Sequence, residues 1–370
     1  MTSSIRLPTD AALRSAVPSA LYDWYKVNAR TLPWRVPPHS QSLPDPYHVW
    51  LSEIMLQQTT VAAAIPYFQR FIERWSDVGA LAATDEADVM AAWAGLGYYA
   101  RARNLVRCAR LVAASGGLFP DNEETLRALP GIGAYTAAAI AAIAFGRRAV
   151  VVDANVERVV ARLFAVAEPL PGARSRIRTL AESITPDMRA GDHAQAMMDL
   201  GSMICTPRAP MCGQCPLSGE CMAYRSDVAG DLPRKQVKPP KPQRSGTAFW
   251  VERDGHVLLV RRSGSGILAG MRGLPDDGWS ARSDGSGELP ATGPWQLHKE
   301  RVAHVFTHLR LDLRIASYKG ADPSLVHARI DSAAQWWPLV RIDDAGLPTL
   351  YAKAARLVMN GRRGKEVQSR

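Results

Sequence analysis

Two acidic side chains stand where they could share an acid-base reaction. Glu53 lies in a helical stretch over residues 47–58 that is apolar on most sides, which raises the pKa of a carboxyl group and suits a general acid. Asp153 follows the apolar run 149–152 and precedes a helical stretch over 156–165, so it can cap that helix and stay ionised. Such a pair suits cleavage of a glycosidic bond. Taken singly, a solvent-facing Glu53 and a purely capping Asp153 are the competing interpretations.

Four of the five cysteines lie within one short segment after a helical stretch, separated by six, two and five residues: Cys205, Cys212, Cys215 and Cys221. Four thiolates can hold a zinc ion or a [4Fe–4S] cluster. Zinc ribbons usually take their ligands from two separate CxxC pairs, so one CxxC in a single loop favours the iron–sulfur cluster. The fifth, Cys108, is expected to be a buried, unreactive thiol.

The string LPGIGAYTA over residues 129–137 joins two helical stretches. Gly131 and Gly133 permit a tight hairpin with positive φ, and their bare backbone lets N–H groups approach an anion. The following helix directs its N-terminal dipole the same way. This arrangement suits a DNA phosphate without reading sequence. An ordinary glycine turn between two helices is the alternative for a bare GxG.

These residues must be positioned by a chain of 370 residues with 45 basic and 35 acidic side chains, a net charge of +10. The excess of positive charge favours a polyanionic partner. With 47% hydrophobic and 22% charged residues, the composition excludes a largely disordered or collagen-like chain. No apolar run reaches the roughly 18 residues of a membrane span, and no secretory signal is visible.

The pattern divides the chain into segments. Residues 1–226 have helical periodicity, and 227–246 form a basic, Pro-rich linker. Residues 247–359 change to strand alternation, with strands at 247–252, 256–261 and 309–315, a turn at 253–255 and a helix at 349–359. This part is therefore α+β. Residues 360–370 are a polar tail that we expect to be disordered.

In this order, the motifs resemble the helix-hairpin-helix DNA glycosylases of the endonuclease III superfamily, and more finely the adenine DNA glycosylases of the MutY type. The strings that carry the resemblance are LPWR (32–35), VWLSEIMLQQT (49–59), GLGYYARARNL (95–105), LPGIGAYTA, VDANVERV (152–159), QAMMDLGSMICT (195–206) and the four cysteines. The resemblance covers about 21–221 and, more loosely, the second domain.

The resemblance implies a mostly α-helical, iron–sulfur glycosylase domain followed by an α+β Nudix-like (MutT-like) domain. A six-helix module over about 46–150 would face a cluster module made of 1–45 and 151–226, with DNA in the cleft between them. The linker and the Nudix-like domain would close around the duplex from the far side.

The same resemblance assigns the chemistry. Glu53 matches the acid that protonates adenine at N7, and Asp153 matches the carboxylate that stabilises the cation at C1′. Tyr135 stands where some relatives carry a tyrosine that assists at the sugar. Asn155 matches a residue that orients the catalytic groups and water. The four cysteines would hold a [4Fe–4S] cluster.

Other matched residues would contact DNA. Gln58 and Tyr98 match wedges that enter the base stack opposite the target, which offsets the energy of flipping. Trp34, Arg35 and Gln195 would lie near the adenine pocket. Plain core packing is the alternative for Tyr98 and Trp34.

One position decides the reaction subtype. Bifunctional relatives carry a Lys at the place of Tyr135, and that amine attacks C1′ and leads to strand cleavage. A tyrosine cannot form the imine, so we expect base excision without an efficient lyase step. Glu157, acidic where some relatives are basic, points the same way. Ala154 replaces a glycine of some relatives and could shift Asp153 slightly.

In the second domain, the glutamate-rich box with which Nudix hydrolases hold magnesium is absent between residues 246 and 370. The resemblance therefore implies a reader of 8-oxoguanine rather than a hydrolase. Phe306, Thr307 and His308 match its Phe-Ser-His loop, with Thr307 adding a methyl group. The alternative is that this string only begins the alternating strand.

The sequence thus predicts a monomeric, cytoplasmic bacterial enzyme that removes adenine mispaired with 8-oxoguanine or guanine in double-stranded DNA. An endonuclease III-like lyase is a rival that Tyr135 and the second domain disfavour. A catalytically silent binder of damaged DNA would have to lack Glu53 or Asp153. A Nudix hydrolase lacks its magnesium box.

Overall fold

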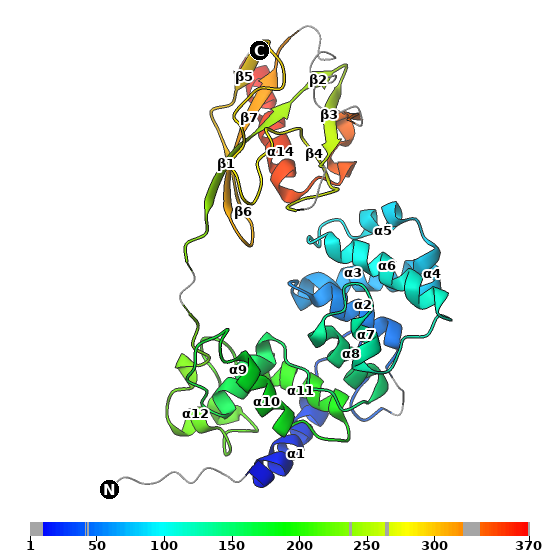
Figure 1. Cartoon of the computed structure of the whole chain (residues 1–370), viewed down its shortest axis with the longest axis vertical. Helices are drawn as coiled ribbons and strands as arrows, with labels where there is room; N and C mark the ends of the chain where they lie inside the picture. Colours follow the sequence, from blue (N-terminus) through cyan, green and yellow to red (C-terminus); the bar gives the residue numbers. More distant parts are fainter. Residues whose placement is uncertain are drawn as a thin grey trace. The chain divides into compact units, whose positions relative to one another are not determined.

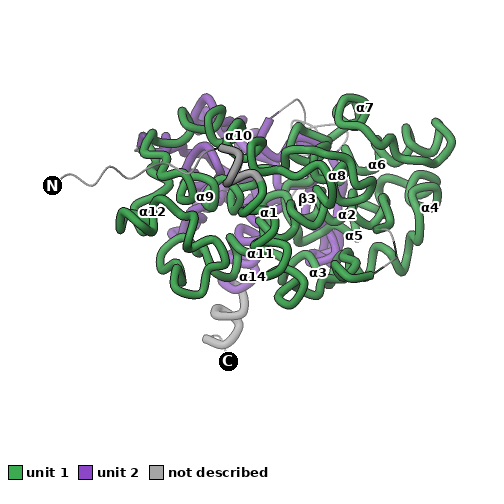
Figure 2. Tube along the Cα trace, turned by 90° about the horizontal axis from the view of Figure 1, so that it is seen from below, with its two compact units in different colours: residues 1–237 green, residues 238–370 purple. Residues whose placement is uncertain are grey.

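The computed structural model describes residues 10–40, 42, 44–236, 239–262, 266–320 and 334–368. The chain forms two compact units, residues 1–237 and 238–370, which Figure 2 colours separately. Among the described residues, no helix has both the length and the apolar character to cross a membrane.

The first unit is helical (Figure 1), and most of its buried hydrophobic residues fall into two large cores. The larger core is built by α2 (Pro46–Leu56), α3 (Val61–Arg74), α4 (Val78–Ala83), α5 (Glu86–Ala92), α6 (Ala100–Ala114), α7 (Glu123–Arg127) and α8 (Ala134–Phe145). The second core is built by α1 (Asp10–Asn28), α9 (Ala154–Leu163), α10 (Arg174–Ser183) and α11 (Ala190–Met203), followed by η1 (Cys212–Gln214), α12 (Met222–Arg225) and η2 (Ala229–Asp231).

Side-chain caps decide where several of these helices begin. Asp77 accepts a hydrogen bond from the N–H of Ala80 at α4, and Asp85 accepts one from Ala87 at α5. Each cap satisfies N–H groups that a helix start leaves without an internal partner. Asp85 lies two residues after the end of α4, and the new helix begins at the next residue, Glu86. The described part of 46–150 therefore contains seven helices instead of the predicted six.

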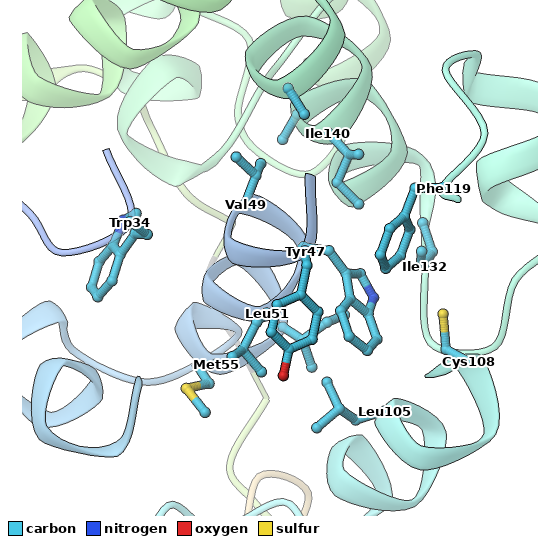
Figure 3. Close-up of a cluster of buried hydrophobic side chains, with 14 of the residues drawn as sticks. Trp34, Tyr47, Val49, Leu51, Met55, Leu105, Cys108, Phe119, Ile132 and Ile140 are labelled. Atoms are coloured by element: carbon cyan, nitrogen blue, oxygen red, sulfur yellow. The ribbon is translucent and has the colours of Figure 1, made fainter. Parts of the chain in front are cut away.

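Helix α2 lies at the centre of the larger core. Figure 3 shows Val49, Leu51 and Met55 pointing into a cluster with Ile140 of α8 and Leu105 of α6. Trp50 is fully buried, and its ring centroid lies 5.1 Å from that of Phe119. A helix that is apolar all round belongs inside a protein. Any polar side chain on α2 is therefore held rigidly, which matters for Glu53.

The second unit contains two four-stranded sheets (Figure 1). One holds β1 (Gln243–Trp250), β5 (Trp295–Leu297), β6 (Val302–Val305) and β7 (Arg310–Tyr318), with β1 parallel to β7. The other holds β2 (Glu252–Arg253), β3 (His256–Arg261), β4 (Arg272–Gly273) and β8 (Gln335–Pro338). After η3 (Leu339–Ala345), α14 (Thr349–Gln368) supplies Leu350, Tyr351 and Val358 to the core. This is the predicted α+β architecture.

Three boundaries in this unit differ from the sequence-based expectation. Strand β1 begins at Gln243, inside the predicted linker, because its backbone pairs with β7 from that residue onward. The strand predicted at 247–252 is split into β1 and β2. Helix α14 continues to Gln368, so the tail expected to be disordered is helical over its described part. Arginine, lysine and glutamate all favour a helix.

Candidate active site

A cavity of about 550 Å³ opens between the two helical cores of the first unit. That volume is within the usual range for small-molecule sites. Glu53 from α2, Tyr135 from α8, and Asp153 and Asn155 at the start of α9 all line it. Three further predicted residues, Trp34, Arg35 and Gln195, together with Gln58, line the same cavity. The structure therefore brings eight of the sequence-predicted site residues into one pocket.

Glu53 is not on a solvent-facing stripe of its helix. The residue is 5% exposed, and its Oε2 has no hydrogen-bond partner among the described residues. Burial raises the pKa of this carboxyl group to about 7; the hydrogen bond from Tyr135 lowers it and the charge of Asp153 raises it. Near neutral pH, a large fraction of Glu53 therefore carries the proton that a general acid needs.

Asp153 is the N-cap of α9 and a wall of the cavity at once. Its Oδ1 accepts a hydrogen bond of 2.7 Å from the N–H of Val156. Its Oδ2 accepts one of 2.8 Å from Nδ2 of Asn155. The two hydrogen bonds fix the orientation of the carboxyl group. The capping interpretation and the functional one hold together, because a single side chain does both.

Asn155 is held in turn by a buried arginine that sequence reasoning missed. Nη2 of Arg158 donates to Oδ1 of Asn155 at 2.9 Å and to the carbonyl of Gly201 at 2.6 Å. Its Nε donates to the carbonyl of Cys205 at 2.7 Å. The amide of Asn155 must therefore present its NH₂ group to Asp153. The sequence predicted Asn155 but gave no signal for the residue that orients it.

A second missed residue, Asp199, fixes the far wall of the cavity. Its carboxylate is fully buried on α11 and accepts hydrogen bonds from Nε of Arg30 at 2.6 Å and from Nη1 of Arg35 at 2.7 Å. A buried carboxylate needs such partners. It ties the loop that follows α1 to α11. The predicted residue Arg35 therefore reaches the cavity as part of an ion-paired group.

Three other predicted side chains complete the cavity wall. Gln195 is 5% exposed on α11. Trp34 is 8% exposed, and its ring packs edge-on against Phe68 with centroids 5.2 Å apart. The hydroxyl of Tyr135 lies 3.6 Å from Sδ of Met198 besides its contact with Glu53. Trp34 thus serves both the core and the pocket, so its two interpretations are compatible.

Gln58 and Tyr98, the predicted wedges, lie in turns that precede α3 and α6. Gln58 is exposed at the cavity rim, and Tyr98 is 50% exposed. Both have left-handed backbone, with φ of 60° and 47°. This conformation is uncommon for residues other than glycine and is typical of functional sites. Tyr98 is therefore not simply part of the core.

The glycine hairpin lies between α7 and α8 as predicted, but only Gly131 has positive φ; Gly133 is extended, with φ of −88°. Gly131 has φ of 80°, and a Cβ there would lie 2.9 Å from Cβ of Asn104. Gly133 is the N-cap of α8 and carries no capping side chain. Both glycines are exposed. The start of this helix therefore offers backbone N–H groups and the positive end of its dipole to solvent.

The four predicted cysteine ligands line one small cavity beside Arg162. All are free thiols, and Nη1 of Arg162 lies 3.2 Å from Sγ of Cys205. Burial raises the pKa of Cys215 to about 11, and the neighbouring thiols add to the rise. A bound metal would oppose this rise, because cysteine ligands must be deprotonated. Among the described residues, no three His, Cys, Asp or Glu side chains form a group placed for a single metal ion.

Other predicted residues lie outside the cavity. Glu157 forms an ion pair with Arg174, N to O 3.3 Å. Cys108 is fully buried, and burial raises its pKa to about 12, as expected of an unreactive thiol.

In the second unit, Phe306, Thr307 and His308 form the turn between β6 and β7. A hydrogen bond from the N–H of Phe306 to the carbonyl of Leu309 closes this turn. Thr307 and His308 are exposed. The string therefore precedes the strand rather than beginning it.

Comparisons with known families match both units. Residues 51–186 match a family described as HhH-GPD superfamily base excision DNA repair protein. Residues 247–357 match the NUDIX domain family.

Curated relatives match over most of the chain. The adenine DNA glycosylase of Homo sapiens is 32% identical over an alignment 420 residues long, gaps included. The alignment covers 96% of this chain and 76% of the relative. The adenine DNA glycosylase of Mycolicibacterium smegmatis is 42% identical over 250 residues, 67% of this chain and 84% of the relative.

Solved structures match the helical part. A thermostable thymine-DNA glycosylase has a TM-score of 0.53 and 30% identity, covering 59% of this chain and all of that one. A trapped endonuclease III–DNA covalent intermediate has a TM-score of 0.50 and 21% identity, covering 60% of this chain and all of that one. The latter likeness concerns the fold alone.

Proposed function

The chain belongs to the adenine DNA glycosylases of the HhH-GPD superfamily, and we propose that it removes adenine mispaired with 8-oxoguanine or guanine by acid-assisted hydrolysis. It is an adenine DNA glycosylase of base excision repair, with a helical glycosylase domain followed by a NUDIX domain. The observation that carries the mechanism is the meeting of Glu53 and Asp153 in one cavity.

In the proposed reaction, Glu53 donates its proton to N7 of the extruded adenine. The C1′–N9 bond then breaks, and its electron pair leaves with the base. Asp153 stabilises the positive charge that develops at C1′ in the oxocarbenium-like transition state. Water adds at C1′ and gives up a proton to the carboxylate of Glu53, which restores the acid. The raised pKa of Glu53 supports its role as the proton donor, and the hydrogen bonds at Asp153 fix its carboxyl group in the cavity wall.

Tyr135 supports a monofunctional reaction. Its hydroxyl contacts Glu53, and burial holds its pKa well above the usual range, so it remains a neutral phenol. A phenol cannot form the imine through which a lysine cleaves the DNA strand. We therefore assign Tyr135 to positioning Glu53 and the sugar.

The substrate is proposed to be double-stranded DNA. The exposed hairpin at Gly131 and Gly133 would hold a backbone phosphate, and Gln58 and Tyr98 would fill the space that the flipped adenine leaves. The wall formed by Trp34, Arg35 and Gln195 would enclose the base. The turn at Phe306, Thr307 and His308 would contact the 8-oxoguanine.

The family generally carries a [4Fe–4S] cluster. We propose that Cys205, Cys212, Cys215 and Cys221 hold it, because the crowding of their free thiols suits a cationic group. When bound, the cluster would cross-link the loop that follows α11. Arg162 would then donate to a ligand sulfur, and Arg158 to the carbonyl of the same cysteine.

The decisive experiment is single-turnover excision on a duplex with adenine opposite 8-oxoguanine. Glu53→Gln should lower the excision rate by about 10²–10⁴-fold, the usual contribution of a general acid, while duplex binding persists. Glu73→Gln is the matched control, because Glu73 is exposed near the end of α3. Unchanged excision by Glu53→Gln would overturn the acid assignment.

Borohydride trapping tests the reaction subtype on the same substrate. The protein should yield little covalent protein–DNA product, since no lysine occupies the place of Tyr135. Efficient trapping would instead assign the chain to the bifunctional lyases.

A further inference from the structure

Arg101, in the first turn of α6, is a cation that the mechanism above does not use. Arg101 is only 8% exposed. Arginines are seldom buried unless their donors find partners. Here both terminal nitrogens, Nη1 and Nη2, donate hydrogen bonds, whereas Nε has no partner among the described residues. No carboxylate pairs with it among the ion pairs of the described residues. Its partners are instead backbone carbonyls and one hydroxyl, which belong to two turns far apart in the sequence.

The first turn contains Gln58. Nη1 of Arg101 donates to the carbonyl of Ile54 at 3.0 Å and to that of Met55 at 2.9 Å. Nη2 donates to Oγ1 of Thr59 at 3.1 Å. The two carbonyls belong to the last turn of α2, which has no basic residue of its own. Arg101 thus supplies the positive charge that a helix C-terminus favours, and it holds the chain on both sides of Gln58.

The second turn contains Tyr98. The same Nη2 donates to the carbonyl of Leu96 at 3.1 Å and to that of Gly97 at 3.4 Å. The guanidinium carbon lies 5.5 Å from the centre of the Tyr98 ring and 5.3 Å from that of Trp93, within the range of cation–π contacts. Arg101 therefore contacts both the backbone before Tyr98 and its aromatic ring.

One planar group thus joins two turns whose central residues both have left-handed backbone. Strained turns of this kind persist only where their surroundings fix them. A guanidinium can do so because its donors form a rigid fork that reaches several acceptors at once. A lysine ammonium is a single point charge and cannot hold acceptors on both sides with the same geometry.

We propose that Arg101 is a positioning residue that fixes the Gln58 and Tyr98 turns relative to each other, so that both side chains enter the base stack together. The proposal rests on the proposed function, which makes these two residues the wedges. Arg101 would thus support the extrusion of adenine from the base stack and take no part in cleaving the glycosidic bond.

The test measures extrusion without cleavage. In a Glu53→Gln background, 2-aminopurine replaces the target adenine opposite 8-oxoguanine, and its fluorescence rises when it leaves the stack. Arg101→Met should lower the extrusion equilibrium on the order of tenfold per bound complex, as expected when directly contacting groups are uncoupled. Arg101→Lys should fall between Arg101→Met and the unaltered arginine.

Arg110→Met is the matched control. Arg110 lies on the same helix and also donates to backbone carbonyls, those of Ala82 and Thr84, but it is exposed and remote from both turns. It should leave the fluorescence rise unchanged. The fluorescence rise is divided by the amount of bound protein–DNA complex, and thermal unfolding of each variant is recorded. These two controls separate a loss of extrusion from a loss of folded protein.

Two outcomes have distinct meanings. If the Glu53→Gln protein extrudes the base and Arg101→Met extrudes it equally well per bound complex, the role of Arg101 is refuted. If the protein with Arg101 intact extrudes the base in no duplex, the proposed function itself is contradicted, and the role of Arg101 falls with it. In the Glu53-containing protein, Arg101→Met should slow excision while the pH at which the rate declines stays the same, because the acid is untouched.

Discussion

At the scale of single residues, the protonation of Glu53 should set the pH dependence of excision. Its pKa is raised from 4.5 to about 7, chiefly by burial. The acid works only while protonated, so the single-turnover rate should be level below pH 7 and fall about tenfold per pH unit above it. A rate that rises through this range would contradict the assignment. The measurement is a pH–rate profile of excision at saturating enzyme.

Tyr135→Phe should move that profile in a defined direction. The hydrogen bond from Tyr135 lowers the pKa of Glu53, so its loss should raise the pKa and shift the decline in rate to higher pH. The plateau should also be lower, because the phenol no longer assists at the sugar. A shift to lower pH would show that Tyr135 does not donate to the acid.

The residues of the pocket differ in how far the sequence could predict them. Glu53 and Asp153 each carry a local signal, an apolar helix around one and a helix start beside the other. Asp199 has none, because its partner Arg30 lies 169 residues away and only the folded chain brings them together. The sequence also gives no signal for Arg101, because four of its five acceptors are backbone carbonyls, which any residue type could supply.

At the scale of elements, the packing of α11 on α9 places Asn155. Gly201 makes this contact possible, because a Cβ there would lie 2.7 Å from Cβ of Asn155 and 3.2 Å from its backbone. Gly201→Ala should therefore destabilise the protein by roughly 1–3 kcal/mol, the usual effect of overpacking, and should slow excision by displacing Asn155. Thermal unfolding and single-turnover excision check both parts.

Gly230→Ala is the control for that variant, since an added Cβ at Gly230 meets no atom within 4 Å. It should leave stability and excision close to those of the unaltered protein. If Gly201→Ala behaves in the same way, the close approach of α11 and α9 does not fix Asn155.

Element boundaries show what local patterns leave out. The apolar stretch at 47–58 and the helical period at 156–165 located two helices, although α2 ends at Leu56 and α9 spans Ala154–Leu163. No boundary was predicted for α4 or α5, whose starts depend on the caps Asp77 and Asp85. Strand β1 starts earlier than its alternation suggests, because the hydrogen bonds that define it come from β7, more than sixty residues later.

At the scale of the whole molecule, the net charge of +10 should dominate affinity for DNA. Each phosphate neutralised by a basic side chain releases counterions, so log K falls linearly with log salt. If six to ten phosphates are contacted, affinity should drop about 10³–10⁵-fold between roughly 50 and 200 mM salt. Titration of the Glu53→Gln protein with a duplex at several salt concentrations measures the slope, and a flat response would contradict a phosphate-dominated interface.

The ion-paired group at Asp199 has a consequence for synthesis. One wall of the pocket comes from Arg30 and Arg35, and the residue that anchors them is made only some 165 positions later. A chain still growing on the ribosome therefore holds its acid, Glu53, long before that wall can close around a base. The pocket is therefore complete only after Asp199 has been synthesised.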